Sequence, residues 1–130
     1  MLKLKIMLVE DNEDILELLT AFLDGYGFET FAFSSAKEAL EAYVTSNDVF
    51  NLVISDMQMP EMDGISFLLK IQKHKPPHKP LHKPKLVIIT GGVTLDRHND
   101  QTEKNDLIDG LIYKRFRSKD VLSVIKSIFN

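Results

Sequence analysis

The stretch KIMLVEDNEDILELLTAFLDGYGFETFAF, residues 5–33, decides the fold. Its first segment, 5–9, is an unbroken apolar run after the lysine, which is typical of a strand covered on both faces. Residues 28–33 alternate and indicate an edge strand. Between them, four apolar residues follow the spacing of one helix face, and Gly25 and Gly27 end that helix. These four are Ile15, Leu18, Leu19 and Phe22.

The same alternation of strand and helix continues to the end of the chain. Further strands are predicted at 52–55, 86–89 and 111–113, and Ser35 and Ser118 are predicted to cap two of the helices. The apolar helix positions are Ala39, Leu40 and Tyr43, then Ile65, Leu68 and Leu69, and finally Val121, Leu122, Ile125, Ile128 and Phe129. Residues 94–106 hold a single large apolar residue, so we expect a fourth helix there to be short or mobile. Five β–α units predict an α/β fold, a parallel sheet with right-handed crossovers and helices on both faces.

Length and composition limit the classes of protein. With 130 residues, of which 44% are hydrophobic and 27% charged, we expect a single domain over 1–130. The absence of cysteine excludes disulfides, thiolate zinc sites and thiol nucleophiles, and it fits a cytoplasmic location. No apolar run approaches the ~18 residues of a membrane-spanning helix. The net charge of −3 offers no support for direct nucleic-acid binding.

One segment differs sharply in charge from the rest of the chain. Residues 70–85, KIQKHKPPHKPLHKPK, hold six lysines and no acid, and the remaining residues carry a net charge of −9. The prolines predict an extended basic loop at about 74–85. A solvated spacer is the simplest interpretation, and docking to an acidic partner, a membrane surface or an anionic polymer are the alternatives. The three histidines are not expected to bind metal, because the prolines prevent a shared helical face.

Polar side chains stand at the ends of four predicted strands. Glu10 and Asp11 follow the first, Asp56 the third, Thr90 the fourth and Lys114 the fifth. Ligands of such sheets bind at the carboxyl ends of the strands, so these residues should meet. Each alone is explained by a turn, a cap or an acidic first helical turn, but their coincidence at one edge favours a site.

The chemistry of this set points to phosphoryl transfer. Three crowded carboxylates raise each other's pKa, and Mg²⁺ would relieve the repulsion, with Glu10, Asp11 and Asp56 as candidate ligands. The Asp56 carboxylate could then attack phosphorus. Lys114 and the metal would neutralise the transferred oxygens while Thr90 donates a hydrogen bond.

Four motifs carry a resemblance to a known family. VEDN at 9–12, SDMQMPEMDG at 55–64, IITGG at 88–92 and YKRF at 113–116 together resemble the receiver domain of two-component response regulators, including its single-domain type. The resemblance implies a flavodoxin-like five-stranded parallel sheet of order 2-1-3-4-5. It also implies a signalling switch that takes a phosphoryl group from a histidine kinase or histidine phosphotransfer protein and acts on a downstream protein.

The resemblance also implies roles for individual residues. Asp56 is the phosphorylated residue, Thr90 the switch hydroxyl and Lys114 the lysine that faces the phosphate. Glu10, Asp11 and the carbonyl of Gln58 bind Mg²⁺. The protein is then no enzyme beyond accepting phosphoryl from phosphohistidine or a small donor and slowly hydrolysing the acyl phosphate.

Two departures from the family pattern leave a second function open. Arg115 follows Lys114 where the family usually has proline, so we expect a trans peptide bond, which would aim Lys114 differently. Leu111 replaces the usual aromatic residue or histidine that couples to the switch hydroxyl. The alternative is therefore a degenerate receiver that acts as a phosphorylation-independent interaction module. A flavin carrier is disfavoured, because the acidic pocket would repel the flavin phosphate and the loop EDNED lacks glycine.

Overall fold

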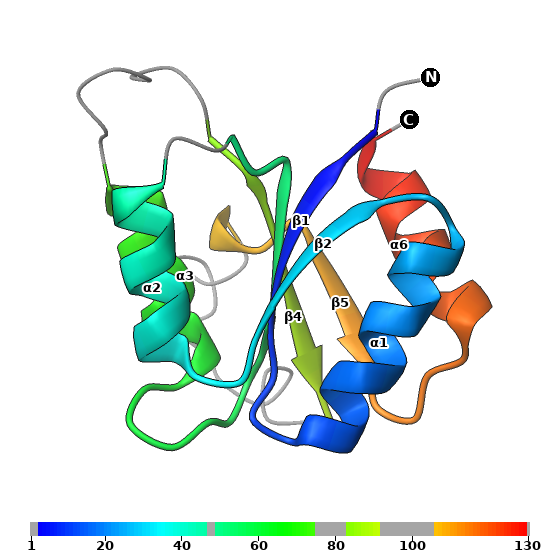
Figure 1. Cartoon of the computed structure of the whole chain (residues 1–130), viewed down its shortest axis with the longest axis horizontal. Helices are drawn as coiled ribbons and strands as arrows, with labels where there is room; N and C mark the ends of the chain where they lie inside the picture. Colours follow the sequence, from blue (N-terminus) through cyan, green and yellow to red (C-terminus); the bar gives the residue numbers. More distant parts are fainter. Residues whose placement is uncertain (1–2, 47–48, 75–82, 92–105, 130) are drawn as a thin grey trace.

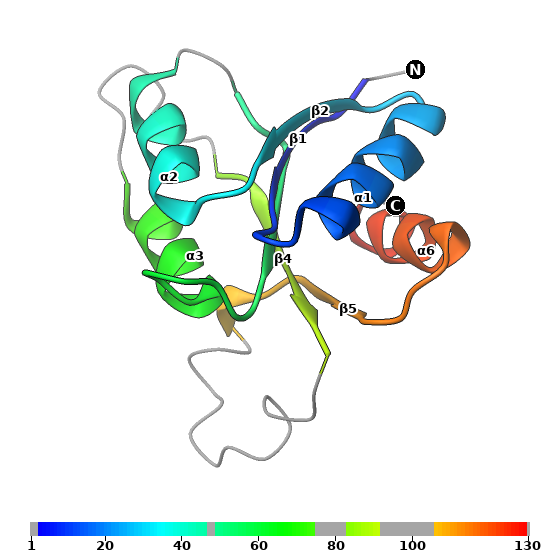
Figure 2. The same ribbon diagram turned by 60° about the horizontal axis from the view of Figure 1, so that its bottom comes forward.

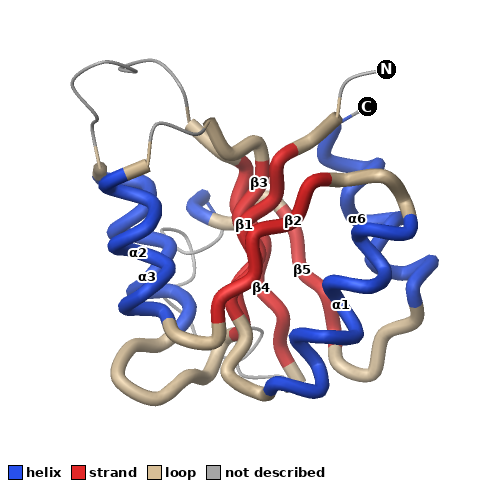
Figure 3. The backbone as a smooth tube through the Cα atoms, viewed as in Figure 1, coloured by secondary structure: helices blue, strands red, loops and turns tan. Residues whose placement is uncertain are grey.

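The computed structural model describes residues 3–46, 49–74, 83–91 and 106–129. Its five strands form one parallel sheet of order β2-β1-β3-β4-β5, which confirms the predicted flavodoxin-like α/β fold (Figures 1 and 3). The strands are β1 (Lys5–Val9), β2 (Glu29–Phe33), β3 (Leu52–Asp56), β4 (Lys85–Thr90) and β5 (Gly110–Tyr113). The predicted edge strand β2 indeed lies at an edge of the described sheet, next to β1.

Helices cover both faces of the sheet. Helices α1 (Glu13–Gly25) and α6 (Ser118–Phe129) lie on one face, and α2 (Ala36–Thr45) and α3 (Gly64–Lys73) lie on the other (Figures 1 and 2). Side chains alternate along a strand, so β1 sends Ile6 into the core under α1 and α6 and Met7 into the core under α2 and α3. The central strand β3 is buried at every position, as its continuous apolar run predicts.

Side-chain caps begin helices α1, α2 and α3, and of these caps the one at Ser35 was predicted from the sequence. The Ser35 hydroxyl accepts a hydrogen bond from the Glu38 N–H, as predicted, and α1 ends at Gly25 as predicted. The cap predicted at Ser118 is wrong by one position, because α6 already begins at Ser118. There the Asp120 carboxylate accepts a hydrogen bond from the Arg117 backbone N–H at 2.8 Å, and this bond lowers the pKa of Asp120.

The strand register brings the predicted site residues to one edge. Val9 lies beside Ser55, Asp56 beside Ile89, and Thr90 beside Tyr113. Because all five strands are parallel, the residues that end or follow β1, β3, β4 and β5 emerge at the same carboxyl edge.

Two expectations fall largely outside the described part of the chain. These are the short or mobile helix over 94–106 and most of the basic loop at about 74–85. Among the described helices, none is long and apolar enough to cross a membrane.

Candidate functional site

A pocket of about 450 Å³ opens at the carboxyl edge of the sheet. Asp56 and Thr90 are the last residues of β3 and β4, and Glu10 and Lys114 directly follow β1 and β5. All six residues predicted from the sequence line this pocket. Among the described residues, the lining consists of Glu10, Asp11, Asn12, Asp56, Met57, Gln58, Thr90, Gly91 and Lys114.

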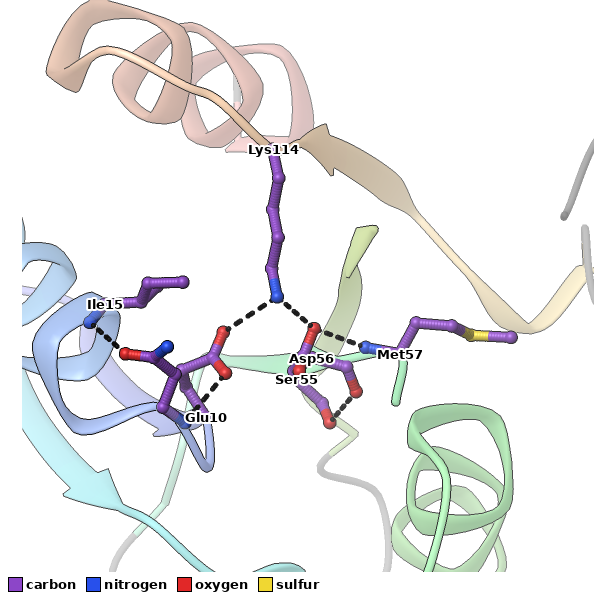
Figure 4. Close-up of polar contacts among 7 residues, drawn as sticks. Glu10, Ile15, Ser55, Asp56, Met57 and Lys114 are labelled. Atoms are coloured by element: carbon purple, nitrogen blue, oxygen red, sulfur yellow. Dashed lines mark hydrogen bonds and ion pairs between the residues drawn. The ribbon is translucent and has the colours of Figure 1, made fainter. Parts of the chain in front are cut away.

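The Lys114 ammonium joins two carboxylates that come from different strands (Figure 4). Its Nζ lies 3.1 Å from Asp56 Oδ1 and 3.6 Å from Glu10 Oε1. The Lys114 side chain is 29% exposed, whereas Glu10 is fully buried and Asp56 is 4% exposed. No peptide bond among the described residues is cis, so the bond after Lys114 is trans as expected, and the ammonium nevertheless points into the pocket.

Glu10 is a buried carboxyl group whose two oxygens differ. Its Oε2 accepts a hydrogen bond from the Asn12 backbone N–H at 3.1 Å, while its buried Oε1 has no hydrogen-bond partner. Burial raises the pKa of Glu10 to about 7, and the nearby Asp56 charge adds to the rise. The Asn12 hydrogen bond and the Lys114 charge offset part of that effect.

The pKa of Lys114 is raised as well, and for a lysine a raised pKa favours the charged form. Burial alone would lower the pKa of Lys114, but its hydrogen bond to Asp56 and the charges of Glu10 and Asp56 raise the pKa above the ordinary value. Lys114 is therefore held as a cation that faces the pocket.

The acidic residues have the composition of a site for a hard cation. Carboxylate oxygens of Glu10, Asp11 and Asp56 all lie within 4.8 Å of one another. Oxygen ligands of this kind suit Mg²⁺, which is commonly held by one or two carboxylates and by water. Glu10 Oε1 also fits, because a metal ion would satisfy a buried oxygen that the described residues leave without a hydrogen bond. The acidic cluster can therefore bind a metal ion.

Thr90 is buried at the end of β4 and lines the pocket. Its backbone carbonyl accepts a hydrogen bond from the Lys114 N–H at 2.8 Å, which ties the end of β4 to the start of the loop after β5. The strand ends that carry the hydroxyl and the ammonium are therefore directly linked.

Three supporting residues were not predicted from the sequence. The Met57 backbone N–H donates a hydrogen bond to Asp56 Oδ1 at 3.0 Å. The Asn12 side chain caps α1, and the Asn12 backbone N–H donates a hydrogen bond to Glu10 Oε2. Gly64 packs so closely on Asp56 that an added Cβ would collide with the Asp56 carbonyl oxygen. Backbone donors carry no side-chain signature, but an asparagine after the acidic pair was a usable signal for a helix cap.

Fold and site together define an α/β domain with an acidic pocket suited to phosphorylation. Residues 6–126 match the response regulator receiver domain family, and the chain belongs to this family. It is 28% identical over 124 residues to a transcriptional regulatory protein, a CpxR homolog of Haemophilus influenzae, covering 95% of this chain and 49% of that protein. It is 34% identical over 71 residues to the transcriptional regulatory protein SrrA of Staphylococcus aureus, covering 55% of this chain and 29% of SrrA. The chain thus spans about half or less of the length of these curated relatives.

Solved structures show the same architecture. A response regulator receiver domain protein from Clostridium thermocellum has 27% identity and a TM-score of 0.80, covering 98% of this chain and 94% of that chain. The response regulator TrrA from Thermotoga maritima has 25% identity and a TM-score of 0.74, covering 96% and 98%. The TrrA structure is a complex with Mg²⁺ and beryllium fluoride.

Proposed function

We propose that this receiver domain is a phosphorylation-dependent switch that accepts a phosphoryl group on Asp56. The observation that carries the proposal is the position of the Lys114 ammonium, 3.1 Å from Asp56 Oδ1. A cation there would face a phosphoryl group that is carried by Asp56, and it would stabilise the charge on that group. Glu10 and Asp11, together with Asp56 itself, would supply the ligands for a metal.

The transfer would use groups that line the pocket. An Asp56 carboxylate oxygen attacks phosphorus, the new O–P bond forms as the P–N bond of a phosphohistidine breaks, and the donor imidazole leaves with the electron pair. Lys114 faces the transferred oxygens and the Thr90 hydroxyl donates a hydrogen bond to one of them. When bound by Glu10, Asp11, Asp56 and the Gln58 carbonyl, Mg²⁺ would neutralise phosphoryl charge.

The proposal extends to the partners of the domain. The phosphoryl donor is a sensor histidine kinase or a histidine phosphotransfer protein, and the signal passes to a downstream protein. Catalysis by the domain itself is limited to accepting the phosphoryl group and slowly hydrolysing the acyl phosphate. We place the protein in the cytoplasm, because phosphoryl donors that derive from ATP are made there.

A mass measurement tests the proposal directly. Wild type, Asp56→Asn and the control Asp24→Asn are incubated with acetyl phosphate and Mg²⁺, and intact mass is recorded. Asp24 is an exposed residue of α1, so its substitution makes the same chemical change far from the pocket. We expect a phosphate adduct on wild type and on Asp24→Asn and none on Asp56→Asn. Equal adduct on all three proteins would remove Asp56 from its role.

A specific observation supports the second candidate, a phosphorylation-independent interaction module. Leu111 is half-buried and packs against the core under α2 and α3, and its aliphatic side chain offers no polar group to the Thr90 hydroxyl. Beryllium fluoride, a phosphoryl mimic, separates the two candidates. With Mg²⁺ present, a switch should shift the amide resonances of 90–113, whereas a degenerate receiver should leave them unchanged.

A further inference from the structure

Helices α2 and α3 lie side by side on the face of the sheet that is opposite to α1 and α6 (Figures 1 and 2). A groove of about 600 Å³ is lined mainly by residues of these two helices. We propose that it is a docking surface for an acidic amphipathic helix of a partner protein. Its α2 wall is formed by Lys37, Leu40 and Val44, and its α3 side is formed by Met62, Lys70 and Lys73. We call these six residues the α2–α3 groove.

The shape of the groove suits a helix. Lys37, Leu40 and Val44 follow one another at spacings of three and four residues, so they form a single stripe along α2. Lys70 and Lys73 have the same spacing on α3. The stripe from Lys37 to Val44 is roughly 10 Å long, or about two helical turns, at 1.5 Å per residue. A guest helix that anchors through residues at i, i+3 or i+4 and i+7 matches this length.

The floor of the groove is apolar and accessible. Val44 is 43% exposed, and it is one of four exposed large hydrophobic residues in the described part of the chain. The half-buried side chains of Leu40 and Met62 complete the apolar surface. An apolar strip with charged residues along its sides is the usual form of a groove that receives an amphipathic helix.

Charge identifies the occupant as acidic. Lys37, Lys70 and Lys73 are exposed, and within the described ranges none of them forms an ion pair. Glu41 is the single acid among the described residues that line the groove. Outside 70–85 the chain carries a net charge of −9, so the groove is a positive surface on an acidic protein. An acidic helix would be attracted electrostatically to this face.

Helix stability does not account for Lys37. It is the second residue of α2, where the positive end of the helix dipole disfavours a cation. Lys70 and Lys73 do stabilise the last turn of α3, where the helix dipole is negative, but they also line the same groove as Lys37. A protein helix fits these features better than an anionic membrane does, because the apolar residues sit in a groove between two helices.

Selection from a library of displayed 16-residue peptides tests the proposal on the full chain. Binding of the enriched peptides is then measured by fluorescence anisotropy, together with binding to vesicles that contain phosphatidylserine. The variants are Lys70→Glu/Lys73→Glu, which reverses the charge of the α3 side, and Val44→Ser, which removes the exposed apolar contact. Lys119→Glu/Lys126→Glu makes the same charge change on exposed residues of α6 and serves as the matched control.

We expect the enriched peptides to combine Asp or Glu with apolar residues at helical spacing. Lys70→Glu/Lys73→Glu should weaken their binding at least about tenfold, Val44→Ser should weaken it severalfold, and the α6 control should bind like wild type. Peptides without an acidic excess would overturn the proposal. So would equal loss of binding in the α6 control, or groove-dependent binding to the vesicles with no peptide enriched.

Discussion

Replacing Glu10 by glutamine should make the stability of the protein less sensitive to pH. Glu10 is fully buried, and its pKa is raised from 4.5 to about 7 in the folded state. The difference of about 2.5 pKa units corresponds to roughly 3 kcal/mol, at 1.36 kcal/mol per unit. Glutamine keeps the shape and can still accept the Asn12 hydrogen bond, but it has no proton to lose.

The sign follows from proton binding in the two states. Between pH 4.5 and 7 the unfolded chain has released the Glu10 proton, while the folded protein still holds it. Because the folded state binds more protons in this window, the free energy of unfolding must fall as pH rises through it. Stability from this group is fully present below pH 4.5 and is lost above about pH 7.

Urea denaturation of both proteins at pH 4.5 and pH 8, with EDTA present, measures the effect. The difference in unfolding free energy, Glu10→Gln minus wild type, should grow by about 3 kcal/mol from the lower to the higher pH. Taking this difference cancels the titration of groups that the two proteins share. A difference that stays constant, or shrinks as pH rises, would show that Glu10 does not titrate as its surroundings require. Added Mg²⁺ should stabilise wild type more at pH 8 than at pH 4.5, because a metal binds the ionised carboxylate.

Three further predictions concern parts of the chain around the site. Asp63→Ala removes the carboxylate that caps α3 by accepting a hydrogen bond from the Ser66 N–H at 2.7 Å. It should lower the unfolding free energy by about 1 kcal/mol in a urea titration, and no measurable change would contradict the capping role. Gly64→Ala forces the new Cβ against the Asp56 carbonyl oxygen, so it should reduce both the stability of the protein and the amount of phosphate adduct formed with acetyl phosphate. The control Gly25→Ala, which has nothing within 4 Å of the added Cβ, should reduce neither. Equal adduct on Gly64→Ala and wild type would mean that the site tolerates the displacement. Deleting 75–83 should leave the adduct unchanged, because the residues that flank the deletion lie far along the chain from the site. His74 follows the end of α3, Pro84 precedes β4, and neither lines the acidic pocket. Loss of the adduct in a folded deletion variant would refute that separation.

Much of the fold was predictable because its signals are local. Unbroken apolar runs identified β1, β3 and β4, and the alternation at β2 identified an edge strand. The Ser35 cap and the Gly25 stop were also visible in the sequence. Element ends were less certain, as at Ser118, where the cap is provided from inside the helix by Asp120. In the sequence, an aspartate that accepts a hydrogen bond from the backbone three residues earlier looks like an ordinary acidic residue of the first helical turn.

The candidate site shows the same division between local and long-range information. The sequence determined which residues could meet, because each of Asp56, Thr90 and Lys114 ends or follows its own strand and parallel strands end at one edge. Tertiary structure alone decided that one ammonium joins Glu10 to Asp56, that Glu10 is buried with a pKa of about 7, and that Val44 stays exposed in a groove between two helices. Strand and helix patterns depend on neighbours a few residues away, whereas burial and charge pairing depend on residues that are brought together only when the sheet and its two helical layers have packed.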